Sequence, residues 1–413
     1  MQKSELLNEH IYDQERADEF VAGRAKMFGM SRRDFAFRFA AGALASVALP
    51  SFGQTASVAQ TDQSVLKPAP PEFFRRSGSN LEMRWEAMYN RGYIVPNELF
   101  FVRNNSPVVP RIDQKLWQLK IEGTGVSRPR TFSYNDILSM PSVSVIRSIE
   151  CAGNGRDFFE ISHGKKIAGT PWNLGGIGVA EWTGVPLREI LDRCGLKRTA
   201  RDVMPEGLDE KRVSRPMPVL KALADDTLVV YAMNGQPLMP DHGFPVRILV
   251  PGWVGIGNVK WLGRIEVSET ALYTEYNTKK YIMIGPDYKP IPPALGPILT
   301  TQKVKSAFEL PWDGETSGGQ RLLRGRSWSG EGSITKVDVS LDGGKTWQHT
   351  RLREPNIAQA WVRWDLDWDA TPGSYKLQAR ATDNKGNTQP DRIPFNEEGY
   401  FHWAVVTHPI RVK

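Results

Sequence analysis

The order of apolar and polar residues predicts a mixed region of strands and short helices in the first two thirds of the chain. Residues 117–121 alternate apolar and polar side chains, the pattern of a half-buried strand. Residues 227–231 and 246–250 are mostly apolar and predict buried strands. Two short helices are expected, over 134–138 and 185–191. These elements do not follow a regular βαβ order, so an α+β domain is expected.

A proline-rich stretch separates this region from a second one. Residues 286–297 hold five prolines. Beyond them, short alternating runs recur at regular spacing, at 320–328, 334–341, 345–352, 358–366, 373–381 and 402–412. That spacing predicts an antiparallel sandwich of immunoglobulin type. Asp342-Gly343 lies between two of the runs and predicts a hairpin turn; the full phosphate-binding loop motif is missing.

The patterns divide the chain into four parts. Residues 1–59 are expected to be an export signal, and 60–80, rich in Pro, Ser and Gln, a tether. The α+β domain is expected over 81–290 and the sandwich over 298–413.

The export prediction rests on residues 31–35, Ser-Arg-Arg-Asp-Phe, which resemble the twin-arginine motif. A mostly apolar stretch follows, and then small residues that suit a cleavage site. The alternative is an amphipathic helix of the mature fold. The export interpretation predicts a mature chain that starts near Gln60 and reaches the periplasm already folded.

Composition and charge exclude several classes of protein. The 413 residues carry a net charge of +7 and only two cysteines, so no disulfide framework is expected. The basic residues are dispersed and no nucleic-acid motif is present, which argues against a nucleic-acid partner. No apolar run long enough for a membrane span lies in the body of the chain. The charge fits either a basic surface or attraction of an anion.

A turn around Cys151 has the residue types that a redox-metal ligand needs. The alternating run 145–149 predicts a strand that delivers Cys151 to a turn, where two glycines allow close approach of a ligand. Neighbouring Arg147 and Arg156 would favour the thiolate, a soft ligand suited to a redox metal. The alternative is a buried small apolar side chain, which is the interpretation preferred for Cys194 at a helix end.

A second candidate lies in a glycine-rich region that contains His242, Arg247, Asn258 and Lys260. Such turns present backbone N–H groups to phosphate, and the basic side chains add charge. The alternative is two hairpins with incidental basic residues. Spacing alone leaves the two interpretations about equal.

Longer stretches of resemblance to a known family favour the metal-ligand interpretation of Cys151 and the phosphate-site interpretation of the glycine-rich region. The residues 151–154 (Cys-Ala-Gly-Asn), 233–238, 241–247 and 259–263 resemble the sulfite oxidase family of molybdenum–molybdopterin enzymes. The run 337–347 resembles the dimerisation domain of that family. The resemblance implies a sulfite-oxidase-type molybdopterin domain followed by an immunoglobulin-like dimerisation domain. It also implies a molybdenum–molybdopterin cofactor, and no haem in this chain.

The same resemblance assigns roles to single residues. Cys151 would be the thiolate ligand to molybdenum, and Tyr281 matches the active-site tyrosine. Arg156 and Trp172 match substrate-pocket positions, and Arg103 would serve both catalysis and cofactor binding. The residues expected to hold the pterin and its phosphate are Arg103, Asn104, Asn105, Asp209, His242, Arg247, Asn258, Val259 and Lys260.

Two positions depart from the family pattern. Asn105 stands where the family usually has histidine, and Glu398 stands in place of the sulfite-binding arginine. A carboxylate there would disfavour a free dianion, because like charges about 5 Å apart at an effective dielectric of about 20 repel by roughly 3 kcal/mol per charge pair.

Within the family, these departures and the export signal resemble the sulfane dehydrogenase molybdenum subunit of the bacterial Sox system. That branch implies oxidation of sulfane sulfur on a carrier-protein cysteine, by oxygen-atom transfer. It also implies a dihaem c-type cytochrome subunit as electron acceptor, a self-dimer through the C-terminal domain, and a heterotetramer.

Three alternatives stay open at this point. They are a sulfite dehydrogenase acting on free sulfite, a periplasmic methionine sulfoxide reductase, and a non-enzymatic binding module of immunoglobulin type. The C-terminal sandwich argues against the reductase, because that branch resembles the catalytic domain alone.

Overall fold

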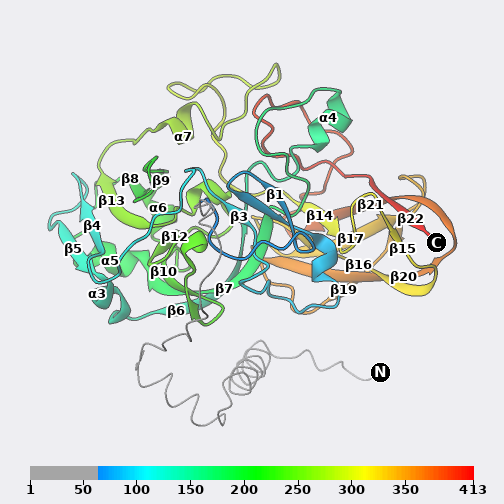
Figure 1. Ribbon diagram of the computed structural model, residues 1–413. Coiled ribbons are helices and arrows are strands. Elements are labelled where there is room, and N and C mark those ends of the chain that lie inside the picture. The colour runs from blue at the N-terminus through cyan, green and yellow to red at the C-terminus, as the bar shows by residue number, and fades with distance from the viewer. Residues whose placement is uncertain (1–63) are drawn as a thin grey trace, which may run out of the picture. The chain divides into compact units, whose positions relative to one another are not determined.

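The computed structural model describes residues 64–413, which lie in one compact unit. The predicted export signal, 1–59, lies outside the described residues. A mixed α+β region is followed along the chain by a β-sandwich that ends at the C-terminus (Figure 1). The expected α+β fold class is confirmed.

Residues 64–80 belong to the fold, which corrects the expectation of a tether. They contribute to a three-stranded antiparallel sheet of β1 (Phe74–Ser77), β2 (Asn80–Met83) and β3 (Val102–Arg103). Val65 and Phe74 are buried against Leu81 and Val102. The backbone N–H of Lys67 donates to the Asp241 carboxylate at 2.7 Å. The polar composition could not predict this docking, because the acceptor comes from a distant part of the chain.

Two five-stranded sheets form the α+β region. The first has the order β11-β10-β7-β6, with β12 also paired to β10; its strands are β6 (Val143–Glu150), β7 (Ile177–Pro186), β10 (Leu228–Met233), β11 (Gln236–Pro237) and β12 (Arg247–Leu249). The second has the order β5-β4-β13-β8-β9; its strands are β4 (Gln118–Glu122), β5 (Arg130–Ser133), β8 (Asp202–Gly207), β9 (Met217–Pro218) and β13 (Leu262–Ser268). The three predicted strands are confirmed, each within two residues at its ends.

Short helices connect the strands. They are η1 (Trp85–Met88), α3 (Tyr134–Leu138), α4 (Phe158–His163), α5 (Leu187–Arg193), α6 (Val219–Ala222), η2 (Pro240–His242), η3 (Gly255–Gly257) and α7 (Glu275–Thr278). The predicted helix 134–138 is confirmed, with Ser133 and Asp136 forming a capping box. The helix expected over 185–191 begins two residues later. Val185 and Pro186 still pair with β10, so the strand continues to the start of α5.

The C-terminal part is a sandwich of two sheets. One sheet has the order β14-β16-β20-β19, with β14 (Lys305–Phe308), β16 (Gly319–Trp328), β19 (Arg351–Arg353) and β20 (Trp361–Ala370). The other has the order β15-β22-β21-β17-β18, with β15 (Gly314–Thr316), β17 (Ile334–Ser340), β18 (Gln348–His349), β21 (Gly373–Asp383) and β22 (His408–Val412). The predicted sandwich is confirmed, and Asp342-Gly343 lies in the turn after β17.

Two of the predicted strands differ in the structure. The run 345–352 is divided between β18 and β19, which pair with opposite sheets, so the chain crosses from one layer to the other. The run 402–412 is a strand only from His408 onward. The backbone just before it returns to the α+β region, where Phe401 donates to the carbonyl of Ala152 at 2.9 Å.

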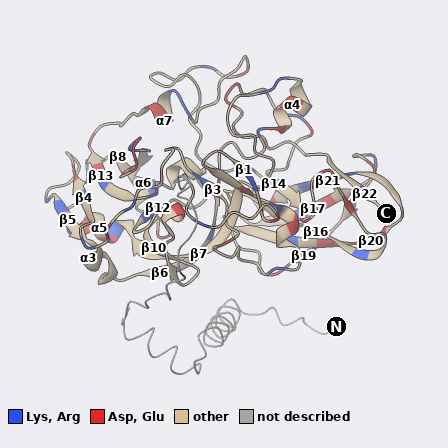
Figure 2. Cartoon of the chain, in the orientation of Figure 1, with Lys and Arg blue, Asp and Glu red and all other residues tan. Residues whose placement is uncertain are grey.

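Charged residues are spread along the elements of both regions. Segments of both signs are scattered over the helices, strands and loops, and neither sign gathers on one element (Figure 2). Over residues 64–413, no helix has both the length and the apolar character needed to cross a bilayer.

Candidate active site

The loop that carries Cys151 begins where β6 ends. Cys151 is buried, and its N–H donates to the carbonyl of Gly176 at 2.8 Å. Asn154 closes the turn by donating its N–H to the carbonyl of Cys151 at 2.9 Å. The strand-to-turn placement predicted for Cys151 is confirmed. Cys194 is buried at the end of α5, and burial raises the pKa of its thiol to about 11.

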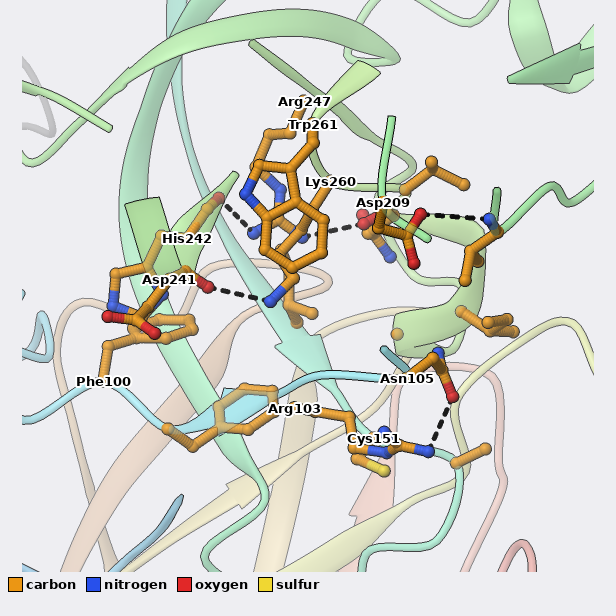
Figure 3. Close-up of a pocket in the computed structure, with 18 of the residues that line it drawn as sticks. Phe100, Arg103, Asn105, Cys151, Asp209, Asp241, His242, Arg247, Lys260 and Trp261 are labelled. Carbon is orange, nitrogen blue, oxygen red and sulfur yellow. Dashed lines mark hydrogen bonds between the residues drawn. The ribbon is translucent and has the colours of Figure 1, made fainter. Parts of the chain in front are cut away.

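Cys151 lies on the wall of a cavity (Figure 3). The cavity brings together side chains from widely separated segments. Of the residues predicted from the sequence, those that line it are Arg103, Asn105, Cys151, Asp209, His242, Arg247, Asn258, Val259, Lys260 and Tyr281.

One end of the cavity is cationic, and we call Arg247, Lys260, His242 and nearby Lys67 the cation cluster. The Arg247 guanidinium donates to the carbonyls of His242 at 3.0 Å and Asn258 at 2.9 Å. The Lys260 ammonium donates to the carbonyl of Asp241 at 2.8 Å and to the side chain of Asn104. Asn104 therefore does not line the cavity itself but contacts Lys260, which does.

Burial opposes charge throughout the cation cluster. It lowers the pKa of Arg247 to about 9 and that of Lys260 well below its ordinary value, with Arg247 adding repulsion on Lys260. Burial, Lys67, Lys260 and Arg247 together hold the pKa of His242 well below its usual range. An anion in the cavity would oppose each of these shifts.

Lys67 is the member of the cluster that sequence reasoning missed. Its ammonium donates to the carbonyls of Asn97 at 3.2 Å and Phe100, and burial lowers its pKa to about 7. The Asp241 carboxylate, which accepts from the Lys67 backbone, partly offsets that effect. The Lys-Pro-Ala-Pro-Pro sequence around Lys67 gave no signal of a buried cation.

The other end of the cavity holds Cys151 with Arg103, Asn105 and Tyr281, and we call these four residues the thiol end (Figure 3). The Arg103 guanidinium lies beside the Cys151 thiol (Figure 3). Burial alone would lower the pKa of Arg103, but the facing Tyr281 and Cys151 raise it above its ordinary value. The amide oxygen of Asn105 accepts from Arg103 at 2.7 Å and from the Tyr281 hydroxyl at 3.1 Å.

The arginine beside the thiol differs from the one expected. Arg147 donates to the Asp226 carboxylate at 2.9 Å and does not line the cavity. Arg156 lies behind the cysteine loop, where its guanidinium donates to the carbonyls of Thr170 at 2.8 Å and Glu398 at 3.2–3.3 Å. Arg103, the last residue of β3 in a different sheet, supplies the positive charge at the thiol.

Two further predicted positions lie outside the cavity lining. Trp172 is fully buried against Phe101, at a ring distance of 6.2 Å. The Glu398 carboxylate pairs with the Lys280 ammonium at 3.0 Å, next to Tyr281 in sequence. It is the carbonyl of Glu398, and not its carboxylate, that holds Arg156.

The remaining predicted residues support the wall. The Asp209 carboxylate accepts from the N–H of Val213 at 3.1 Å and from the hydroxyl of Ser106. The Asn258 amide oxygen accepts from the N–H of Val250 at 2.7 Å. Val259 pairs through its carbonyl with the N–H of Ile248 at 2.9 Å.

The donor set fits a phosphate-bearing, thiolate-ligated cofactor. Nε2 of His242 and Nε of Arg247 are buried and have no hydrogen-bond partner among the described residues, which is costly unless a ligand supplies one. Both belong to the cation cluster, while Cys151 offers a soft ligand at the other end. Among residues 64–413 no group of three or more His, Cys, Asp or Glu could hold a metal, so a metal here would depend on Cys151 and a non-protein ligand.

Comparison with protein families divides the chain into the same two regions, the α+β region and the sandwich. An oxidoreductase molybdopterin binding domain matches residues 106–276, and a Mo-co oxidoreductase dimerisation domain matches residues 299–410.

Known relatives extend the match. Sulfite oxidase of Gallus gallus is 35% identical over 320 residues, covering 73% of this chain and 69% of the relative. The mitochondrial sulfite oxidase of Homo sapiens is 36% identical over 324 residues, 74% of this chain, and the chain spans 59% of its length. The crystal structure of the sulfane dehydrogenase SoxCD from Paracoccus pantotrophus is similar with a TM-score of 0.72 at 27% identity, covering 88% of this chain and 96% of that chain.

The cavity and these matches together define a molybdopterin oxidoreductase fold with its dimerisation domain. The chain belongs to the sulfite oxidase family, and its cofactor is molybdenum–molybdopterin.

Proposed function

We propose that this protein oxidises sulfane sulfur attached to a carrier-protein cysteine. Each oxidation step would add one oxygen atom from water and release two electrons and two protons. A dihaem c-type cytochrome subunit would accept the electrons, and the reaction would take place in the periplasm after export by the twin-arginine route. Self-association through the sandwich is supported by the dimerisation-domain match, and a heterotetramer with the cytochrome is the proposed complex.

The choice of substrate rests on one observation: the charged side chains near Cys151 already have partners within the protein. The Arg156 guanidinium donates its hydrogen bonds to two backbone carbonyls, and the Glu398 carboxylate pairs with Lys280. Arg103 donates to the neutral oxygen of Asn105. A free dianion therefore meets fewer available cations than the family pattern would provide, which favours a less charged sulfur.

When bound, molybdenum–molybdopterin would supply two-electron oxygen-atom transfer and would pass the two electrons one at a time to the acceptor. Cys151 would ligate the metal, and the cation cluster would hold the phosphate. Tyr281 lines the cavity, and its hydroxyl, which donates to Asn105 in this structure, would donate instead to an oxygen on sulfur when substrate is bound. Arg103 balances negative charge at the thiol end.

Free sulfite is the second candidate substrate. The sequence is 36% identical to a mitochondrial sulfite oxidase, whereas the solved sulfane dehydrogenase is 27% identical. Arg103 still offers one cation near the thiol. Methionine sulfoxide reduction has less support, because the dimerisation domain matches residues 299–410.

The test compares substrates on one preparation of molybdenum-loaded protein. Reduction of cytochrome c is measured with sulfite, with thiosulfate, and with a carrier protein loaded with thiosulfate on its cysteine. We expect the loaded carrier to give the highest kcat/KM, and the same carrier with its cysteine blocked to give none. A higher kcat/KM for free sulfite would replace the proposal with the second candidate.

A further inference from the structure

An ammonium group from the sandwich reaches the loop that carries Cys151. Lys305, the first residue of β14, donates to the Glu150 carboxylate at 2.8 Å and to the carbonyl of Asn154 at 2.7 Å. The side chains of Lys305 and Glu150 are each 3% exposed. This buried ion pair therefore joins the dimerisation domain to the cysteine loop.

The two contacts of Lys305 lie on either side of the cysteine. Glu150 directly precedes Cys151, and Asn154 follows it by three residues. The Asn154 amide nitrogen donates to the Glu150 carboxylate at 2.9 Å, and its amide oxygen accepts from the N–H of Gly176 at 2.9 Å. One ammonium thus closes a ring of hydrogen bonds around the cysteine.

Stability alone is a weak reason for such a pair. Taking two charges out of water costs about as much as their attraction returns, and apolar pairs of the same size often stabilise a fold equally well. What an apolar pair cannot do is satisfy the Asn154 carbonyl and fix the two flanks of the loop at once. The ring therefore favours a role in geometry.

We propose that Lys305 and Glu150 are positioning residues that hold the Cys151 thiolate in the orientation that ligates the metal. The dimerisation domain would thereby support the active site of its own chain, in addition to its contacts between chains. The inference rests on Cys151 as the metal ligand and does not depend on which sulfur substrate is oxidised.

Two double variants separate geometry from stability. E150L/K305M removes both charges and keeps apolar volume, whereas E150Q/K305Q keeps hydrogen-bonding side chains at both positions. In cofactor-free protein, alkylation of Cys151 by iodoacetamide is followed by peptide mass spectrometry, with buried Cys194 as the internal reference. We expect E150L/K305M to speed Cys151 alkylation about tenfold while Cys194 and the melting temperature change little. E150Q/K305Q should stay close to wild type.

The loaded enzyme gives an independent readout. The electron paramagnetic resonance signal of molybdenum reports on its thiolate ligand, so E150L/K305M should shift this signal and E150Q/K305Q should restore it. A change of fold stability alone would not produce that pattern.

The matched control is a second buried ion pair, whose two side chains both belong to the sandwich. Arg326 pairs with Glu309 at 2.7 Å and donates to the carbonyl of Tyr93 at 3.0 Å, so Arg326 joins the same two regions without a hydrogen bond to the cysteine loop. E309L/R326M should leave Cys151 alkylation and the molybdenum signal unchanged. The proposal is overturned if this control raises alkylation as much as E150L/K305M, or if E150L/K305M behaves as wild type.

A fallback keeps the test decisive where the apolar pair does not fold. E150Q/K305Q is then compared with E150Q/K305A, which lacks the donor to the Asn154 carbonyl. Faster alkylation of Cys151 in the second variant alone supports the ring, and equal rates in the two reject it.

Discussion

The two ends of the cavity differ in how their surroundings shift the pKa values of their basic side chains. In the cation cluster, Arg247, Lys260 and Lys67 are buried with few acidic partners, and burial lowers the pKa of each. At the thiol end, the one arginine that lies beside Cys151 has a raised pKa, because Tyr281 and Cys151 face it. The first end is prepared for a permanent anion. The second is prepared for groups whose charge changes during a reaction.

The largest effect is expected at the thiol itself. Cys151→Ser should abolish turnover, because a hard hydroxyl replaces a soft thiolate at a redox metal. The cation cluster is untouched, so the pterin should still co-purify, as measured by its fluorescence after oxidation. Cys194→Ala is the control, with turnover kept. More than a tenth of the wild-type rate in Cys151→Ser would exclude Cys151 as the ligand.

Next in size is the loss of one positioned hydroxyl. Tyr281→Phe should lower the rate of single-turnover reduction by about 10²–10³, the usual effect of removing one aligned donor. Tyr276→Phe provides the control, since its ring lies 6.2 Å from that of Tyr281 but does not line the cavity. Equal rates in wild type and Tyr281→Phe would remove this hydroxyl from the site.

A smaller effect tests the cation cluster through pH. The folded-state pKa of Lys67, about 7, lies below its ordinary 10.5, so the unfolded chain binds more protons between these values. The stability of the cofactor-free protein should therefore rise with pH from about 7 to 10, by at most about 1.4 kcal/mol per pH unit for this group. Below pH 7 Lys67 is charged in both states, and its cost is constant.

Lys67→Met should remove this part of the slope. Melting temperatures at a series of pH values measure it, and Lys115→Met, at an exposed position, is the control. Parallel curves for wild type and Lys67→Met would show that the ammonium is not a member of the cluster.

The smallest effect concerns the ion pair of Lys280 and Glu398, which lies outside the cavity lining and next to Tyr281 in sequence. Glu398→Gln frees Lys280 from an ion pair that is partly exposed and contributes at most about 1 kcal/mol. The freed lysine should raise kcat/KM for sulfite a few-fold, and added salt should weaken the gain. Lys280→Met in the same background should cancel it. No response in either variant would mean that this ion pair does not affect substrate choice.

Local patterns along the chain determined much of the framework. Alternation of side chains predicted β4 and β16, and Ser133 ahead of an apolar helix predicted α3, because both depend on neighbours in sequence. The residue types around Cys151 and His242 suggested a thiolate and a phosphate site, and the longer matches to the sulfite oxidase family decided in favour of both, because spacing alone left the phosphate site undecided. The sequence also showed that Asn105 and Glu398 depart from the family pattern.

Tertiary structure alone decided which charges meet. Arg147 and Arg156 lie closer to Cys151 in sequence than Arg103 does, yet Arg103 reaches the thiol and the other two are held elsewhere. Lys67 and Lys305 showed no pattern in the chain, but one joins the cation cluster and the other closes the cysteine loop. A buried charge is placed by partners from distant segments, because only close approach compensates for its lost water. The order of residues along the chain does not record that approach.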